Sequence, residues 1–141
     1  MRMLVMATAA SLLATTAHAD ANIAGHWTFA AVIENDCTFG GTAHLKKTGD
    51  DRFEAELTAR QTCPTLPEDY VVRQECSASQ IGKQLSVRCR IVEFVNGFES
   101  EFYYPDNFTL TVESSARMHG ALVSAGNARP AEWIRDEGGI S

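Results

Sequence analysis

Apolar and polar side chains alternate along most of this chain of 141 residues, and the alternation restricts the fold more than any other feature of the sequence. The first run covers residues 22–34, and the side chains on one side of it are Ile23, Gly25, Trp27, Phe29, Ala31 and Ile33. A period of two is typical of a β-strand with one buried face. No segment shows a convincing helical period, so the sequence predicts an all-β domain.

Eight alternating runs follow one another along the chain. They comprise residues 22–34, 42–47, 53–60, 70–80, 84–95, 107–113, 118–124 and 130–136. An even number of up-and-down strands places the last strand antiparallel to the first, and closure then removes the exposed sheet edges. We therefore expect an eight-stranded antiparallel up-and-down meander closed as a small barrel. The turn-forming pair Asn96-Gly97 leaves open a short ninth strand within residues 98–104.

The N-terminus has the features of a secretory signal peptide. Arg2 precedes an apolar run of about 11 residues, and Ala17-His18-Ala19 supplies the small-x-small pattern of a cleavage site. A spanning helix needs about 20 apolar residues, so a membrane span is the weaker interpretation. We expect residues 1–19 to be a signal peptide, residues 20–141 to be a single barrel domain, and the protein to be periplasmic or secreted.

The four cysteines predict two disulfides. An even number of cysteines in a small exported domain favours bridges over a zinc site, and none of them forms a C-x-x-C pair. A two-residue turn at Gly82-Lys83 places Cys76 opposite Cys89 in a non-hydrogen-bonded pair, where a bridge can close. Cys37 then pairs with Cys63, and each bridge could stabilise the fold by about 3 kcal/mol.

The net charge and the positions of the histidines argue against nucleic-acid binding and against a metal or catalytic site. The chain has 12 basic and 18 acidic residues, a net charge of −6, which argues against nucleic acid as a partner. His26, His44 and His119 fall on outward positions of different strands, and we expect them not to converge. With no nucleophile beside a base, we expect no catalytic residues, no metal, no cofactor and no enzymatic activity.

Loop lengths distinguish the two ends of the expected barrel. One end, the tight-turn end, has short connections at residues 48–51, 81–84 and 114–117. The other, the loop-rich end, has longer connections at residues 34–41, 63–69, 96–106 and 126–129. Variable loops held by rigid strands commonly carry binding sites, so we expect a site at the loop-rich end.

Several side chains near the loop-rich end are candidate ligand-binding residues. Alternation turns Gln74 and Glu93 inward, where a carboxylate must find a cation or have a raised pKa. The alternative for Glu93, which we favour, is a wetted rim position or a local bulge that turns it outward. The aromatic residues around the longest loop form a lid or a partner-binding patch, or pack in the core. They are Phe94, Phe98, Phe102, Tyr103 and Tyr104.

Gly25-His26-Trp27, eight strands and Arg135 on the last strand together resemble the lipocalin-like, or calycin, barrels. The resemblance implies that Trp27 closes the barrel floor and that Arg135 packs across its ring. The chain also resembles bacterial metalloprotease inhibitor barrels, in which a cysteine soon follows the Gly-x-Trp motif. That likeness implies an inhibitory N-terminal arm at Asp20-Ala21-Asn22, although those barrels have one disulfide.

These observations lead to a functional hypothesis. We expect an exported, non-enzymatic barrel that engages a small apolar ligand or an exported protein partner at its loop-rich end. The alternative is a periplasmic protease inhibitor that acts through its N-terminal arm and rim loops, so that deleting residues 20–23 abolishes inhibition without unfolding the barrel. The sequence leaves open whether the interior is hollow, because small and aromatic side chains both point into it.

Overall fold

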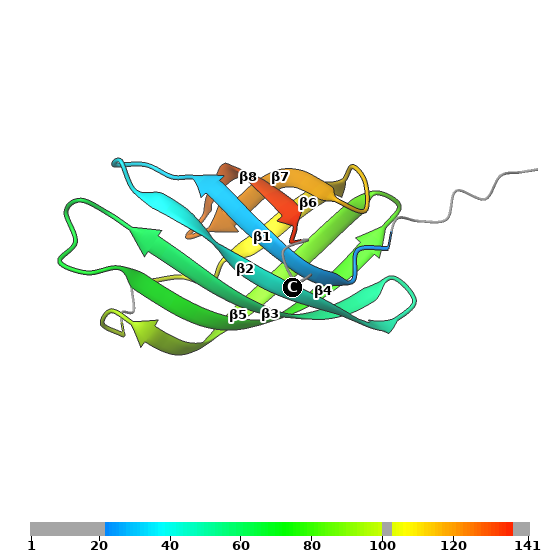
Figure 1. The fold of residues 1–141 in the computed structure, drawn as a ribbon, viewed down its shortest axis with the longest axis horizontal. Coiled ribbons are helices and arrows are strands. Elements are labelled where there is room, and N and C mark those ends of the chain that lie inside the picture. The colour runs from blue at the N-terminus through cyan, green and yellow to red at the C-terminus, as the bar shows by residue number, and fades with distance from the viewer. Residues whose placement is uncertain (1–21, 100–102, 137–141) are drawn as a thin grey trace, which may run out of the picture.

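A computed structural model of the chain describes residues 22–99 and 103–136, in which eight antiparallel strands form a closed barrel without a helix (Figure 1). The strands are β1 (Gly25–Val32), β2 (Thr38–Gly49), β3 (Arg52–Thr62), β4 (Tyr70–Ile81), β5 (Gln84–Asn96), β6 (Asn107–Val112), β7 (Arg117–Ser124) and β8 (Asn127–Arg135). β1 pairs with both β2 and β8, which closes the barrel. The predicted fold class is confirmed. The expected signal peptide, residues 1–19, lies outside the described residues.

Two strands begin three or more residues earlier than the sequence pattern predicts. β2 starts at Thr38 instead of residue 42, because Gly40 and Gly41 continue the ladder with β1 although glycine is a weak strand former. β8 starts at Asn127, so Pro130 lies inside a strand.

The ninth strand is not formed by the described part of residues 98–104, which has no strand assignment. The loop-rich end, with the β1–β2 and β3–β4 loops, is at the left of Figure 1.

Both disulfides form as predicted. Cys76 lies opposite Cys89 in the β4–β5 register, and their Cα atoms are 4.0 Å apart. Cys37 and Cys63 form the second bridge across the loop-rich end, with a Cα–Cα distance of 4.2 Å. The described residues contain no helix that could span a membrane.

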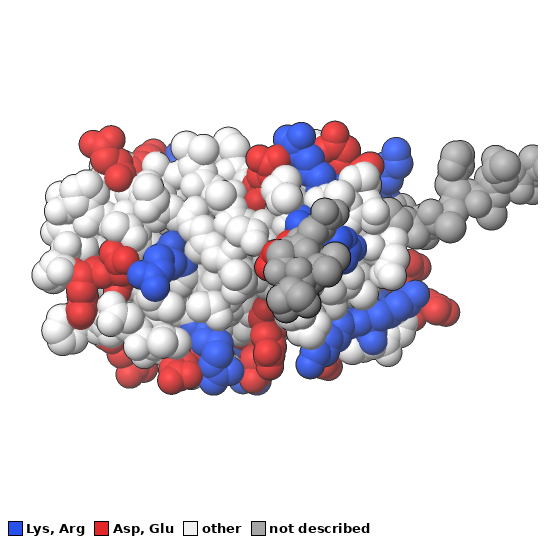
Figure 2. Space-filling model, in the orientation of Figure 1, with Lys and Arg blue, Asp and Glu red and all other residues white. Residues whose placement is uncertain are grey.

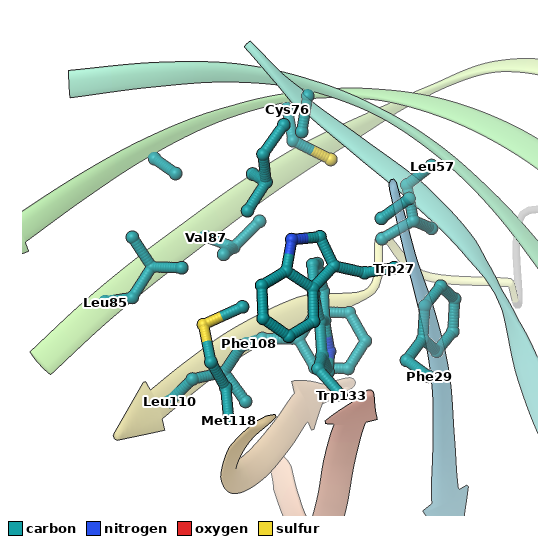
Figure 3. Packing of buried hydrophobic residues seen from close by; sticks show 14 of the residues in the cluster. Trp27, Phe29, Leu57, Cys76, Leu85, Val87, Phe108, Leu110, Met118 and Trp133 are labelled. Carbon is teal, nitrogen blue, oxygen red and sulfur yellow. The ribbon is translucent and has the colours of Figure 1, made fainter. Parts of the chain in front are cut away.

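Aromatic side chains fill the middle of the barrel (Figure 3). The ring of Phe29 stacks on Trp133 at 5.6 Å between centroids and meets Phe108 at 5.3 Å. Gly41 lies opposite Phe29 in the β1–β2 register, so the large ring has a neighbour without a side chain. The Nε1 atom of Trp133 is buried and has no hydrogen-bond partner among the described residues. The composition left open whether the interior is hollow, and this section of the barrel is filled with side chains.

Arg135 and Trp27 close the floor at the tight-turn end. The guanidinium carbon of Arg135 lies 4.7 Å from the centroid of the Trp27 ring, which confirms the expected cation–π contact. Arg135 also donates to the carbonyl oxygens of Ala24, at 2.7 Å, and Asn22, at 2.6 Å. Trp27 Nε1 donates to the carbonyl oxygen of Ile23, whose side chain is fully buried. The chain before β1 is therefore held against the floor.

Replacing Gly41 with alanine tests the close packing of β2 on the core. A Cβ atom at Gly41 would overlap the carbonyl oxygen of Thr58 and come within 2.7 Å of Phe29 Cζ. We expect Gly41→Ala to lower the free energy of unfolding by about 1–3 kcal/mol, measured by urea denaturation.

Gly49→Ala is the matched control, because the nearest atom to a Cβ there is Arg52 Cβ at 3.9 Å. Its effect should stay within about 0.5 kcal/mol. Equal losses of stability in the two variants would contradict this account of the core.

Candidate functional site

A pocket of about 260 Å³ opens at the loop-rich end of the barrel, and we call it the mouth pocket. Its apolar lining is Ile33, Phe39 and Leu122, and the charged side chains that reach it are Glu34, Asp106 and Arg129. Phe39 and Leu122 point inward from β2 and β7, where the alternation of each strand buries them. The pocket therefore combines apolar side chains with polar and charged groups, and contacts of both kinds orient small molecules in protein sites.

The deepest charged group in the mouth pocket is Asp106, which is 3% exposed and precedes β6 directly. Its Oδ2 atom accepts hydrogen bonds from Gln74 Nε2 at 2.6 Å and from the hydroxyl of Tyr103 at 2.9 Å. The backbone nitrogen of Asp106 donates to Gln74 Oε1 at 2.9 Å. Gln74 thus holds both the backbone and the side chain of Asp106, and the loop before β6 is tied to β4.

Burial raises the pKa of Asp106 to about 6, while the hydrogen bonds from Gln74 and Tyr103 act in the opposite direction. Among the described residues, no cation contributes to the shift. Burial also raises the pKa of the Tyr103 hydroxyl, and the charge of Asp106 and their hydrogen bond add to that shift. Near neutral pH, the pocket therefore contains a carboxylate whose side-chain donors, in the part of the chain that the structure describes, are both neutral.

Arg129 and Glu34 form an ion pair at the rim of the mouth pocket. The distance from Arg129 Nη2 to Glu34 Oε1 is 2.5 Å. Asn35 and Asp36, with φ of 63° and 57°, form the tight bend between β1 and β2 that brings Glu34 to the rim. The one basic side chain among the residues lining the pocket is therefore already paired with an acid.

Three aromatic rings pack together beside the Asp106 network. Tyr103 lies 5.6 Å from Tyr70 and 5.8 Å from Phe94 between ring centroids, and Tyr70 and Phe94 are 6.4 Å apart. Tyr103 belongs to both groups, because its hydroxyl donates to Asp106. Of the predicted site residues, the structure therefore brings Gln74 and Phe94 together through Tyr103 and Asp106.

The other predicted aromatic residues lie elsewhere. Phe98 is 74% exposed and Tyr104 is 49% exposed, and neither has a ring contact among the described residues. Phe102 lies outside the described residues. The aromatic residues of the longest loop thus divide into a packed group and exposed side chains.

Glu93 points outward, so the inward position given by strict alternation is wrong. The register between β4 and β5 shifts between Arg73 and Gln74, so that Gln74 lies opposite Ile91 and Arg73 lies opposite Glu93. The extra residue, Val92, reverses the alternation beyond it. Glu93 Oε2 instead pairs with Arg73 Nε at 3.1 Å, and the Glu93 side chain is 55% exposed. The bulge considered as the alternative explains this orientation.

His26 and His44 are in contact, so the prediction that the three histidines stay apart is wrong for this pair. They lie opposite each other in the β1–β2 register on the outer face, and their rings stack with centroids 4.0 Å apart. Burial, followed by the charge of His26, lowers the pKa of His44. His119 is on β7. Among residues 22–99 and 103–136, no three His, Cys, Asp or Glu side chains are grouped so that they could hold a metal ion.

A larger groove of about 540 Å³ lies on the outer face of β2 to β5, beside His44. Its charged side chains come from exposed positions, and Glu75 and Arg90 in it form an ion pair. In the face shown in Figure 2, basic and acidic groups likewise lie next to one another, and uncharged atoms cover much of the middle. We favour the mouth pocket as the site, because its Asp106 carboxylate is buried, whereas the charged side chains of the groove lie at exposed positions.

Asp106 is the residue that the sequence analysis missed. The sequence pattern places it at the end of the connection 96–106, one residue before the strand that is predicted to begin at Asn107. The signal was nevertheless present, since Asp106 continues the inward alternation of Phe108 and Leu110 by one step.

Comparison with known protein families finds no match, and comparison with curated protein sequences finds none either. Solved structures with this fold include mFAP1, a redesigned β-barrel bound to DFHBI, with a TM-score of 0.60 and 10% identity, covering 81% of this chain and 94% of that chain. A de novo designed fluorescence-activating β-barrel has a TM-score of 0.59 and 13% identity, and the match covers 80% of this chain and 93% of that chain. These similarities show the fold of an eight-stranded β-barrel.

The pH dependence of stability tests the burial of Asp106. A carboxyl whose pKa rises from 3.8 to about 6 on folding binds its proton more tightly in the folded state, so it stabilises the fold as pH falls through 6. From pH 7.5 to pH 5.0, Asp106 should add about 1.5 kcal/mol to the free energy of unfolding. We expect Asp106→Asn to lack this gain in urea denaturation at the two pH values. Identical pH dependence of the wild type and the variant would refute the buried, uncompensated carboxylate.

Proposed function

We propose that this protein is an exported, non-enzymatic barrel that binds a small, largely apolar molecule in the mouth pocket. The observation that carries the proposal is the pairing of an apolar floor, Phe39 and Leu122, with the buried Asp106. A buried carboxylate without a cation lowers stability, and such groups are concentrated at functional sites. A protein partner at the same end is the other outcome that the experiment below distinguishes.

Fold similarity supports a small-molecule ligand and also limits where it binds. mFAP1 is bound to DFHBI, so a barrel of this fold can hold a small molecule. Here Phe29, Phe108 and Trp133 occupy the middle of the barrel, which leaves the mouth for a ligand. The Trp27–Arg135 floor is consistent with a calycin-like ancestry, in which the closed end is structural and the open end binds.

Two features of the chain support the proposed compartment. Two disulfides are typical of an oxidising, extracellular environment. Together with the signal-like segment at residues 1–19, they support a periplasmic or secreted protein.

The absence of enzymatic activity is part of the proposal. Ser124 lines the mouth pocket, but its hydroxyl donates to the carbonyl oxygen of Pro105 at 3.0 Å, so no base holds its proton. A nucleophile needs such a base within hydrogen-bond reach. The arrangement of Ser124 therefore supports binding and not catalysis.

Protease inhibition through the N-terminal arm finds no support in the described residues. Ile23 belongs to the core, and Arg135 holds the carbonyl oxygen of Asn22. Deleting residues 20–23 would therefore remove a core side chain and would not leave the barrel intact, contrary to the expectation for a free arm. Residues 20 and 21 lie outside the described residues.

Two exposed positions beside the pocket give a test that leaves the core untouched. Asn127 lines the mouth pocket, and its exposed neighbour Ala128 does not. The probes are small neutral aromatic molecules, starting with 2-phenylethanol, titrated into the protein and followed by amide NMR shifts. We expect shifts at Phe39 and Asn127 and none at the tight turn around Lys83.

Asn127→Trp should block the opening and weaken probe binding by about tenfold or more, whereas Ala128→Trp should leave it unchanged. Shifts that spread over the outer faces, or equal binding by both variants, would overturn the proposal. Capture of an exported protein without any small-molecule shift would favour the protein-partner alternative instead.

A further inference from the structure

We propose that the mouth pocket selects molecules that carry a protonated amine, with the ammonium group bound to the carboxylate of Asp106 and the apolar part on Phe39 and Leu122. This inference rests on the proposed function, because it names the ligand class of the same pocket. It goes beyond that function in assigning a charge to the ligand.

The first argument is the hydrogen bonding of the carboxylate. Asp106 is almost fully buried, and the two side-chain donors that reach it among the described residues, from Gln74 and Tyr103, both bind Oδ2. An ionised carboxylate offers about four acceptor sites on its two oxygens. The carboxylate therefore has capacity for further donors, and it lines the pocket from which a ligand would approach.

The second argument is the charge balance of the pocket. Its lining contains two carboxylates, those of Glu34 and Asp106, and one guanidinium, that of Arg129, which gives one net negative charge. Arg129 is already paired with Glu34 at 2.5 Å. The carboxylate of Asp106 is thus the uncompensated charge, and a ligand with a single positive charge would balance it.

The third argument is size. A cavity of about 150 Å³ holds a benzene molecule, and the mouth pocket measures about 260 Å³. A single ring with a short chain that ends in an amine fits this volume. Ile33, Phe39 and Leu122 supply the apolar surface for the ring, while Asp106 supplies the carboxylate for the amine.

The fourth argument is that proton binding and ligand binding compete at Asp106. Burial raises the pKa of this carboxyl to about 6, so an ammonium ligand must bind the ionised form that exists above that pH. The other titratable or charged groups that face the pocket or Asp106 among the described residues are Glu34, Arg129 and Tyr103. Amine binding should therefore weaken as the pH falls through 6.

Three matched probes test the inference by isothermal titration calorimetry at pH 7.5: 2-phenylethylamine, 2-phenylethanol and 3-phenylpropanoate. We expect the wild-type protein to bind the amine at least about tenfold more tightly than the alcohol, because one charge-assisted hydrogen bond distinguishes them. Asp106→Asn should abolish this preference while retaining alcohol binding. Glu93→Gln, which removes an exposed carboxylate paired with Arg73, is the matched control and should keep the preference.

A pH series on the wild type keeps the inference testable if Asp106→Asn does not fold. With a carboxyl of pKa about 6, amine affinity should fall about tenfold from pH 7.5 to pH 5.0, while alcohol affinity stays constant. Equal binding of amine and alcohol would overturn the inference and leave the proposed function standing. Tightest binding of 3-phenylpropanoate would also overturn it and would identify Arg129 as the anchor. Absence of binding by all three probes would count against both proposals.

Discussion

The narrow bore of an eight-stranded barrel governs the rest of this structure. At this strand number the interior is just wide enough to be filled by side chains. Phe29 fits because Gly41 lies opposite it, and Phe108 and Trp133 complete the filling. The middle of the barrel is thereby filled, so space for a small molecule inside the barrel lies at an end.

The two ends of the barrel hold their charged side chains in different ways. At the floor, the half-buried Arg135 donates to backbone carbonyl oxygens and lies over the Trp27 ring. At the mouth, Asp106 receives hydrogen bonds from the neutral Gln74 and Tyr103 only, within the described part of the chain. The first arrangement ties the chain before β1 to the floor, whereas the second leaves an almost fully buried carboxylate without a cation among the described residues. This contrast is the basis of the proposal that a ligand binds at the mouth.

Period-two alternation predicts the strands, and their even number predicts closure. The two-residue turn at Gly82-Lys83 determines the β4–β5 register and hence the Cys76–Cys89 bridge, which leaves Cys37 to pair with Cys63. The sequence does not predict the orientation of Glu93, since a bulge reverses the alternation and no residue type marks Val92 as the extra residue. The contact between His26 and His44 was missed because the register across the β1–β2 loop depends on where β2 begins. The burial of Asp106 is not predicted because the sequence pattern begins that strand at Asn107, whereas the alternation from Phe108 continues one step further back.

The ionisation of Asp106 in the ligand-free protein tests the central claim most directly. The carbon chemical shift of its side-chain carboxyl can be followed by NMR as the pH is raised. The account predicts a titration midpoint near 6, because burial is not compensated by a cation. A midpoint near the ordinary aspartate value of about 3.9 would contradict it, since the carboxylate would then be solvated or already paired with a positive charge.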